Sequence, residues 1–129
     1  MRISDLPFIM IRCLILTILI ECLVAYFLKY RKKDLLNILL VNVLTNPIVS
    51  SVPVYFNVKF GVSGRNISLL VLELLVLIVE GFIYHKYLNR RKINPYLLSL
   101  ILNGSSYLLG VIINLVGVWK LWEKLLIYF

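Results

Sequence analysis

Four long runs of apolar residues, separated by short polar stretches, organise the chain. They cover residues 6–28, 35–55, 67–84 and 96–118. A helix needs about 20 residues to cross a hydrocarbon core of about 30 Å, and each run is close to that length. None of the runs alternates apolar and polar positions, as a membrane β-strand would. The pattern therefore predicts an all-α integral membrane protein built as a four-helix bundle.

Composition and charge support this interpretation. Of the 129 residues, 61% are hydrophobic, whereas soluble proteins average about 45–50%. The formal net charge is +8, but most Lys and Arg residues lie in the stretches between the apolar runs. Basic loops beside membrane spans are typical of multi-pass proteins. The lipid bilayer is therefore the expected partner, nucleic acid is not, and residues 1–129 are expected to form a single membrane domain.

The distribution of basic residues predicts an orientation in the cell membrane. Because basic loops favour the cytoplasm, the first and third loops are placed there and both termini outside. Residues 57–66 are polar and are expected to form an external loop. Residues 119–129 combine tryptophan with lysine and are expected to lie at the membrane interface. The predicted cytoplasmic loops carry Lys29, Arg31, Lys32, Lys33, Lys86, Arg90, Arg91 and Lys92, and the other side carries Arg2, Lys59, Arg65, Lys120 and Lys124.

An internal repeat is visible in the polar residues of the chain. A shift of 59 residues aligns the two glutamates and the basic clusters, and a two-residue insertion near Asn94-Pro95 aligns the polar residues that follow. Each copy contains two runs, so both copies enter the membrane from the same side. We therefore expect two parallel two-helix repeats, at about residues 6–56 and 66–118. The matched pairs are Glu21 with Glu80, Asn42 with Asn103, and Thr45 with Ser106.

Helix geometry places the glutamates and asparagines of this repeat in one polar layer. Glu21 precedes Lys29 by eight residues, which corresponds to about 12 Å of helix. Asn42, Glu80 and Asn103 lie at similar distances from the basic loops. A carboxylate near the middle of the bilayer costs about 2.5–3.5 kcal/mol on insertion scales. Two carboxylates at matched depth therefore indicate a built site.

Carboxylate and amide oxygens are hard ligands, and they suit a proton, an alkali or divalent cation, or an ammonium-bearing solute. Two neighbouring carboxylates would not both be charged in an empty site, so a shared proton would make the site sensitive to pH. The alternative is that these polar groups only hold helices together. The sequence does not decide whether a metal ion binds. The candidate binding residues are Glu21, Glu80, Asn42, Asn103, Asn46 and Tyr107.

Three other ionisable residues lie nearer the membrane surfaces. Arg12 and Glu73 are at similar depth on the outer side, and an ion pair between them would lower the cost of burying both. The alternative is that they form an external gate or an ion-attracting vestibule. His85 lies beside the third loop and is expected at the interface, with the end of a proton relay as the other interpretation.

The sequence favours binding or transport over catalysis. It contains no HExxH, no GxSxG and no glycine-rich phosphate loop, which are signatures of several enzyme classes. No cofactor is expected. Cys13 and Cys22 are nine residues apart, on opposite sides of one helix, and are expected to be buried without a role.

The segment Asn42-Val-Leu-Thr-Asn-Pro47, following a helix with Glu21, resembles a pattern in small uncharacterised bacterial four-helix membrane proteins, and the segment at Asn103 looks like their second half. The resemblance implies a helical membrane fold and no particular activity. We therefore expect a transporter or channel-like protein for a cation or a proton-coupled solute. The alternative is a non-transporting subunit or assembly factor. Because four helices enclose little volume, a homo-oligomer or a larger membrane partner is expected in either case.

Overall fold

The computed structural model describes residues 5–89, 93–117 and 120, and the regular structure of these residues is helical. Helix α1 spans Leu6–Phe27, α2 spans Lys32–Tyr87 and α3 spans Pro95–Val116. Each of the three is long and apolar enough to cross a membrane. The predicted all-α class is confirmed, and the apolar helices indicate a membrane protein.

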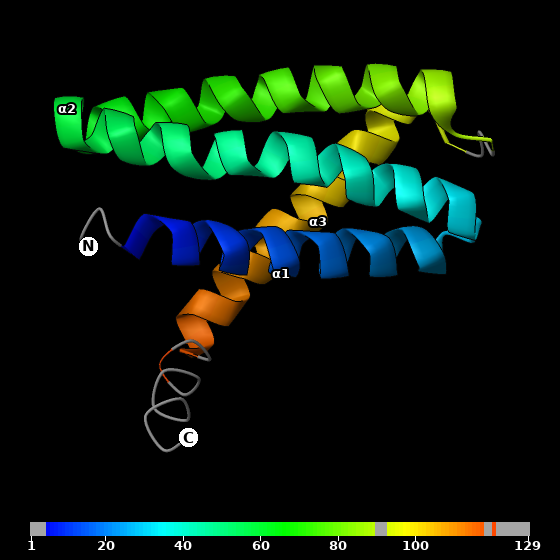
Figure 1. The fold of residues 1–129 in the computed structure, drawn as a ribbon, viewed down its shortest axis with the longest axis horizontal. Helices are drawn as coiled ribbons and strands as arrows, with labels where there is room; N and C mark the ends of the chain where they lie inside the picture. The colour runs from blue at the N-terminus through cyan, green and yellow to red at the C-terminus, as the bar shows by residue number, and fades with distance from the viewer. Residues whose placement is uncertain (1–4, 90–92, 118–119, 121–129) are drawn as a thin grey trace.

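Helix α2 reverses its direction at a single residue. Gly61 has φ 72° and ψ −163°, which is outside the helical region and in a region that only glycine adopts without strain. From there the second arm of α2, residues 62–87, returns along the first arm, residues 32–60 (Figure 1). A hydrogen bond from Thr45 Oγ1 to Glu80 Oε1, 2.9 Å long, connects the two arms.

This reversal corrects two expectations from the sequence. Four helices were expected, whereas the described residues form three, because the second and third apolar runs both belong to α2. Residues 57–66 were expected to form a loop, but they are helical on both sides of Gly61. One glycine with a positive φ is enough to turn the chain, so no loop is needed there. The predicted interfacial segment, residues 119–129, lies outside the described residues except for Lys120.

The ends of α3 follow familiar sequence signals. Asn94 precedes the helix, and its Oδ1 accepts a hydrogen bond from the backbone nitrogen of Tyr96 at 3.0 Å. Pro95 is the first residue of α3, a position where its missing N–H costs nothing. Gly117 ends the helix with φ 72° and ψ 22°, the left-handed conformation common at helix C-termini.

The buried apolar core lies towards one end of the molecule, beside residues 28–31 and 88–94, which we call the basic-loop end. Asp34 Oδ1 accepts a hydrogen bond from the backbone nitrogen of Asn89 at 2.8 Å, which ties the start of α2 to its end. Burial raises the pKa of the Tyr30 hydroxyl in the connection before α2, so this side chain stays neutral in the packed end. The core here consists of Ala25, Tyr30, Ile38, Val41, Tyr84, Leu88, Leu98 and Leu102.

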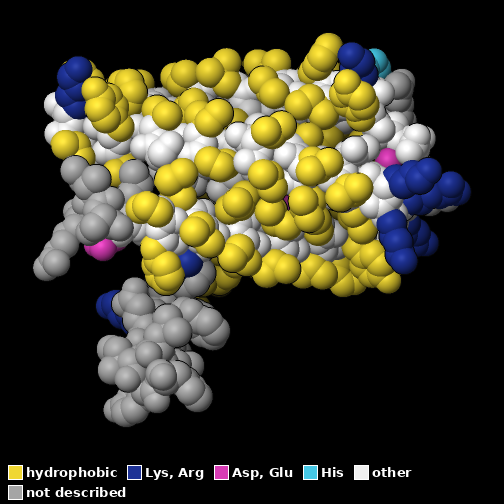
Figure 2. All heavy atoms as spheres, viewed as in Figure 1, with side chains coloured by type: hydrophobic (Ala, Val, Ile, Leu, Met, Phe, Trp, Pro, Cys, Tyr) yellow, Lys and Arg dark blue, Asp and Glu magenta, His cyan; other side chains and the backbone are white. Residues whose placement is uncertain are grey.

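The opposite end, where Gly61 and the end of α3 lie, is more open, and we call it the open end. Helix α3 runs obliquely across α1 and the first arm of α2 as it leaves the basic-loop end (Figure 1). Its buried residues, Leu98, Ser99 and Leu102, all lie in its first half. Exposed apolar side chains cover the flank of the molecule, and Lys and Arg gather towards its ends (Figure 2). The slant of α3 leaves room between the helices on the side of the open end.

Candidate functional site

The Glu21 carboxylate is buried where all three helices meet. Its exposed fraction is 0%. Asn42 Nδ2, from the first arm of α2, donates a hydrogen bond to Glu21 Oε2 at 2.6 Å. Ser106 Oγ, from α3, donates to Glu21 Oε1 at 3.3 Å. Both oxygens of this carboxylate therefore have donors within the chain.

The Glu80 carboxylate, on the second arm of α2, has a similar environment. It is also 0% exposed. Asn103 Nδ2 and Ser99 Oγ donate to Glu80 Oε2 at 2.6 and 3.2 Å. Thr45 Oγ1 donates to Glu80 Oε1 at 2.9 Å. Ser106 Oγ, which donates to Glu21, also lies 2.9 Å from the backbone oxygen of Asn103, the amide donor to Glu80, so the two carboxylates belong to one buried cluster.

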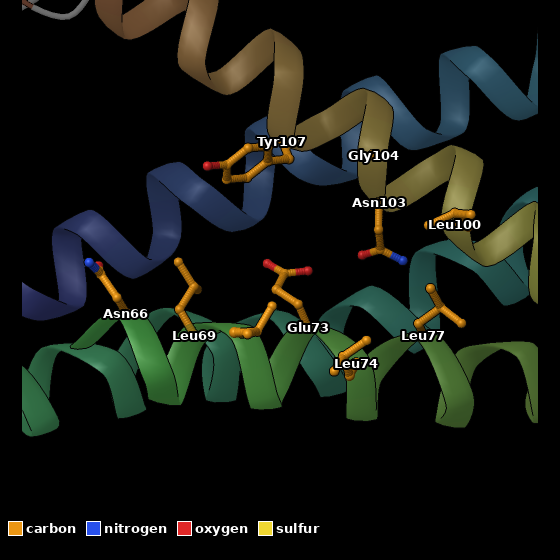
Figure 3. A pocket seen from close by; sticks show the side chains of 10 residues that line it. Asn66, Leu69, Glu73, Leu74, Leu77, Leu100, Asn103, Gly104 and Tyr107 are labelled. Atoms are coloured by element: carbon orange, nitrogen blue, oxygen red, sulfur yellow. The ribbon is translucent and has the colours of Figure 1, made fainter. Parts of the chain in front are cut away.

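Both N–H donors of the Asn42 amide, and both of the Asn103 amide, are engaged in hydrogen bonds within the chain. Asn42 Nδ2 also donates to the backbone oxygen of Ile38 at 3.0 Å. Asn103 Nδ2 also donates to the backbone oxygen of Ser99 at 2.9 Å. An amide group has two N–H donors and one oxygen, so both donors are engaged and the oxygen is left for other partners. In Figure 3 the Asn103 oxygen lies on the side of Glu73 and its nitrogen is turned away.

A polar cavity of about 170 Å³ lies next to this cluster. Its wall includes every donor to the two carboxylates except Ser99, and neither Glu21 nor Glu80 lines it. The volume corresponds to about five or six water molecules. The carboxylate that does reach this cavity is Glu73. The polar wall residues are Asn42, Thr45, Asn46, Asn103, Ser106 and Glu73, together with Thr17, Ser50 and Tyr107.

Two larger cavities share wall residues with this polar cavity. One of about 590 Å³ lies between α3 and the second arm of α2, and Glu73, Asn103 and Tyr107 line both it and the polar cavity. Figure 3 shows the Glu73 carboxylate directed at this space, with Tyr107 on the opposite wall. Leucines, including Leu74 and Leu100, form much of the rest. Glu73 therefore lies between an apolar groove and a polar interior.

Another cavity, of about 570 Å³, lies between α1 and α3. Arg12 and Arg65 line it, and the Arg12 guanidinium also lies 5.7 Å from the centre of the Phe8 ring. Arg12 and Glu73 thus border different large cavities, and their ion pair stays a prediction. His85 is exposed near the end of α2 at the basic-loop end.

The structure brings the sequence candidates together in two groups. Glu21, Glu80, Asn42 and Asn103 form one hydrogen-bonded cluster, while Asn46 and Tyr107 lie outside these hydrogen bonds and line the cavity beside it. Sequence reasoning did not include Ser99 in the site. Its position one helical turn before Asn103 is the signal that could have found it, because residues four apart share a helix face.

The described residues contain no cluster of three or more His, Cys, Asp or Glu side chains that could hold a metal ion. Cys13 is exposed and Cys22 is half-buried, so the expected burial of Cys13 is wrong. Comparison with protein-family models, curated proteins and solved structures gave no match. The resemblance found in the sequence therefore stays a prediction.

Proposed function

We propose that this protein is a small transporter or channel-like protein for a cation or a proton-coupled small solute. One observation carries the proposal: a polar cavity lies among apolar, membrane-length helices, directly beside two fully buried carboxylates. Buried polar groups in membrane helices are costly and usually mark a pathway or a binding site. The cavity, rather than the carboxylate pair alone, is the proposed binding site.

The hydrogen bonds around the cavity favour a positively charged or hydrogen-donating ligand. The amide nitrogens of Asn42 and Asn103 are engaged by carboxylate and backbone oxygens, so their oxygens are the atoms left for a ligand. The Glu73 carboxylate adds a negative charge at the wall. Oxygen acceptors with one carboxylate suit a small cation. In this proposal Glu21 and Glu80 hold the amides in place, and Glu73 contacts the ligand.

The same contacts support a finer description of the fold. The two arms of α2, with α1 and α3, would cross the bilayer four times, as a four-helix bundle of two parallel repeats. Each carboxylate accepts an amide donor from its own proposed repeat and a hydroxyl donor from the other. A two-fold relation along the membrane normal produces this kind of exchange. Both termini outside the cell membrane, and a homo-oligomer or larger partner, remain part of the proposal.

A transport assay with glutamine variants tests the proposed function. The protein is reconstituted in liposomes, a potassium diffusion potential is applied with valinomycin, and internal pH is followed with a trapped dye, with and without external methylammonium. Glu21→Gln and Glu80→Gln are expected to reduce the protein-dependent flux at least tenfold while the protein remains folded. Ser105→Ala is the control, because Ser105 Oγ donates to the backbone oxygen of Ile101 in its own helix. Unchanged flux in both glutamine variants would exclude the proposed role.

A second candidate, a non-transporting subunit or assembly factor, is favoured by one observation. All four carboxylate oxygens of Glu21 and Glu80 already have donors within the chain. Such a cluster could serve only to hold helices together. Under this alternative, the glutamine variants change the oligomer size or the recovery of a partner, and empty and protein-containing liposomes show the same flux.

A further inference from the structure

We infer that Glu21 and Glu80 are two separate proton-binding sites, each served by a hydroxyl group that changes its hydrogen-bond acceptor when the proton binds. The inference rests on the proposed proton-coupled function and names its proton-binding groups. It follows from an arrangement that occurs twice in the cluster, once beside each carboxylate.

The hydroxyl of Thr45 has two acceptors within reach. Thr45 Oγ1 lies 2.9 Å from Glu80 Oε1 and 3.0 Å from the backbone oxygen of Val41. A hydroxyl group has one hydrogen and two lone pairs. When Glu80 is ionised, the hydrogen can point to the carboxylate. When a proton binds to Glu80 Oε1, the new O–H can donate to Thr45 Oγ1, and the threonine hydrogen can turn to Val41.

Ser106 stands in the same relation to Glu21. Its Oγ lies 3.3 Å from Glu21 Oε1 and 2.9 Å from the backbone oxygen of Asn103. A proton on Glu21 Oε1 would donate to Ser106 Oγ, while the serine hydrogen turns to the Asn103 carbonyl. The amide donors contact the other oxygen of each carboxylate, Oε2. The hydrogen bonds donated by the amides of Asn42 and Asn103 therefore stay the same in both protonation states.

This arrangement avoids one cost of protonating or deprotonating a buried carboxylate, which is the loss of a hydrogen-bond partner. A buried donor or acceptor without a partner is destabilising, and here neither protonation state leaves one. The charges that act on the pair come from the carboxylates themselves and from Glu73 on the second arm of α2. Tyr84 on the same arm and Cys22 on α1 are the other titratable neighbours, and α3 carries no charged residue.

Ser99 provides a matched comparison with Thr45. Its hydroxyl donates to Glu80 Oε2 at 3.2 Å, the oxygen that also accepts from Asn103. Ser99 can therefore donate a hydrogen bond to the ionised carboxylate of Glu80. Thr45 can form a hydrogen bond with both the ionised and the protonated carboxyl group. Thr45→Val removes a partner of both forms of Glu80, and Ser99→Ala removes a donor that matters most to the charged form.

The experiment measures the stability of Thr45→Val and Ser99→Ala above and below the protonation step of Glu80. The purified full-length protein is followed by infrared spectroscopy over pH, and the carbonyl band of a protonated carboxyl group is assigned to Glu80 by its loss in Glu80→Gln. Unfolding by added SDS is then measured on both sides of that step. Thr45→Val is expected to lower the folding equilibrium constant about tenfold at both pH values. Ser99→Ala is expected to lower it about tenfold only at the higher pH.

Two results would overturn the inference. In the first, the effect of Thr45→Val disappears on acidification, as for Ser99→Ala, and the hydroxyl then only donates. In the second, no protonated carboxyl band assignable to Glu80 appears while the protein remains folded. The infrared spectra of the variants themselves show whether they fold. Proton binding without any flux in liposomes would leave this inference standing and remove the proposed transport function, so the two failures are distinguishable.

Discussion

Asn42→Leu is expected to lower the free energy of unfolding by about 3 kcal/mol. The Asn42 amide is the donor to Glu21 Oε2, at 2.6 Å, and both side chains are almost completely buried. Loss of this donor leaves a buried carboxylate oxygen without a partner, which costs about 1–3 kcal/mol and more for a charged group. The measurement is SDS-induced unfolding of the purified protein, followed by circular dichroism.

Asn46→Leu is the matched control for this prediction. Asn46 lies one turn further along the same arm of α2 and borders the same cavity, but its Oδ1 accepts a hydrogen bond from Ser50 in its own helix. Its replacement is expected to cost less than about 1 kcal/mol. The double replacement Glu21→Leu with Asn42→Leu should recover most of the lost stability, because neither polar group is then left alone. Equal costs for Asn42→Leu and Asn46→Leu would contradict the assigned role of the Glu21–Asn42 contact.

Glu73→Gln is expected to raise the half-saturating concentration of the transported cation at least tenfold. Glu73 is the carboxylate that borders both the polar cavity and the larger groove beside α3 (Figure 3). Two opposite unit charges 4 Å apart attract each other by about 4 kcal/mol at an effective dielectric constant of 20, and hydration of the ion offsets part of that. The concentration dependence of methylammonium-dependent flux in liposomes provides the measurement.

The effects of Glu73→Gln on maximal flux and on half-saturating concentration distinguish a ligand contact from a proton-binding role. Glu73 lies outside the hydrogen bonds of the buried carboxylates, so the maximal flux should change little while the half-saturating concentration rises. Glu73→Asp keeps the charge on a shorter side chain and should have a smaller effect. A loss of maximal flux with an unchanged half-saturating concentration would argue against Glu73 as a ligand contact.

The helices and the buried cluster could be predicted from the sequence, for two physical reasons. Apolar runs of membrane length have to form helices, because the bilayer offers no partner for unpaired backbone groups. The rise of a helix then set the depth of Glu21 and Asn42 relative to the basic loops. The Glu21–Asn42 and Glu80–Asn103 contacts follow from that common depth, and the structure contains both.

Other features depend on packing that the sequence pattern does not encode. A pattern of polar residues suggested a loop at residues 57–66, because it does not reveal that Gly61 alone can turn the chain. The cavities border α3, which crosses the other helices obliquely, and the hydrophobic pattern does not give the angle of that crossing. For the same reason, the sequence did not predict that Glu21 and Glu80 lie behind the cavity wall while Glu73 reaches the cavity.

The most direct test of this account is whether the polar cavity contains water that is connected with the open end. Cys13 lines this cavity and two of its neighbours. Cys22 lies nearer the basic-loop end, with its sulfur 4.0 Å from the backbone oxygen of Leu35. The reaction of each cysteine with a charged, membrane-impermeant methanethiosulfonate is measured in sealed vesicles, using Cys22→Ser and Cys13→Ser to leave one thiol at a time. We expect Cys13 to react from one side of the membrane only and Cys22 to remain unmodified. If Cys13 is as unreactive as Cys22 from both sides, the cavity is not an aqueous binding site and the proposed function is wrong.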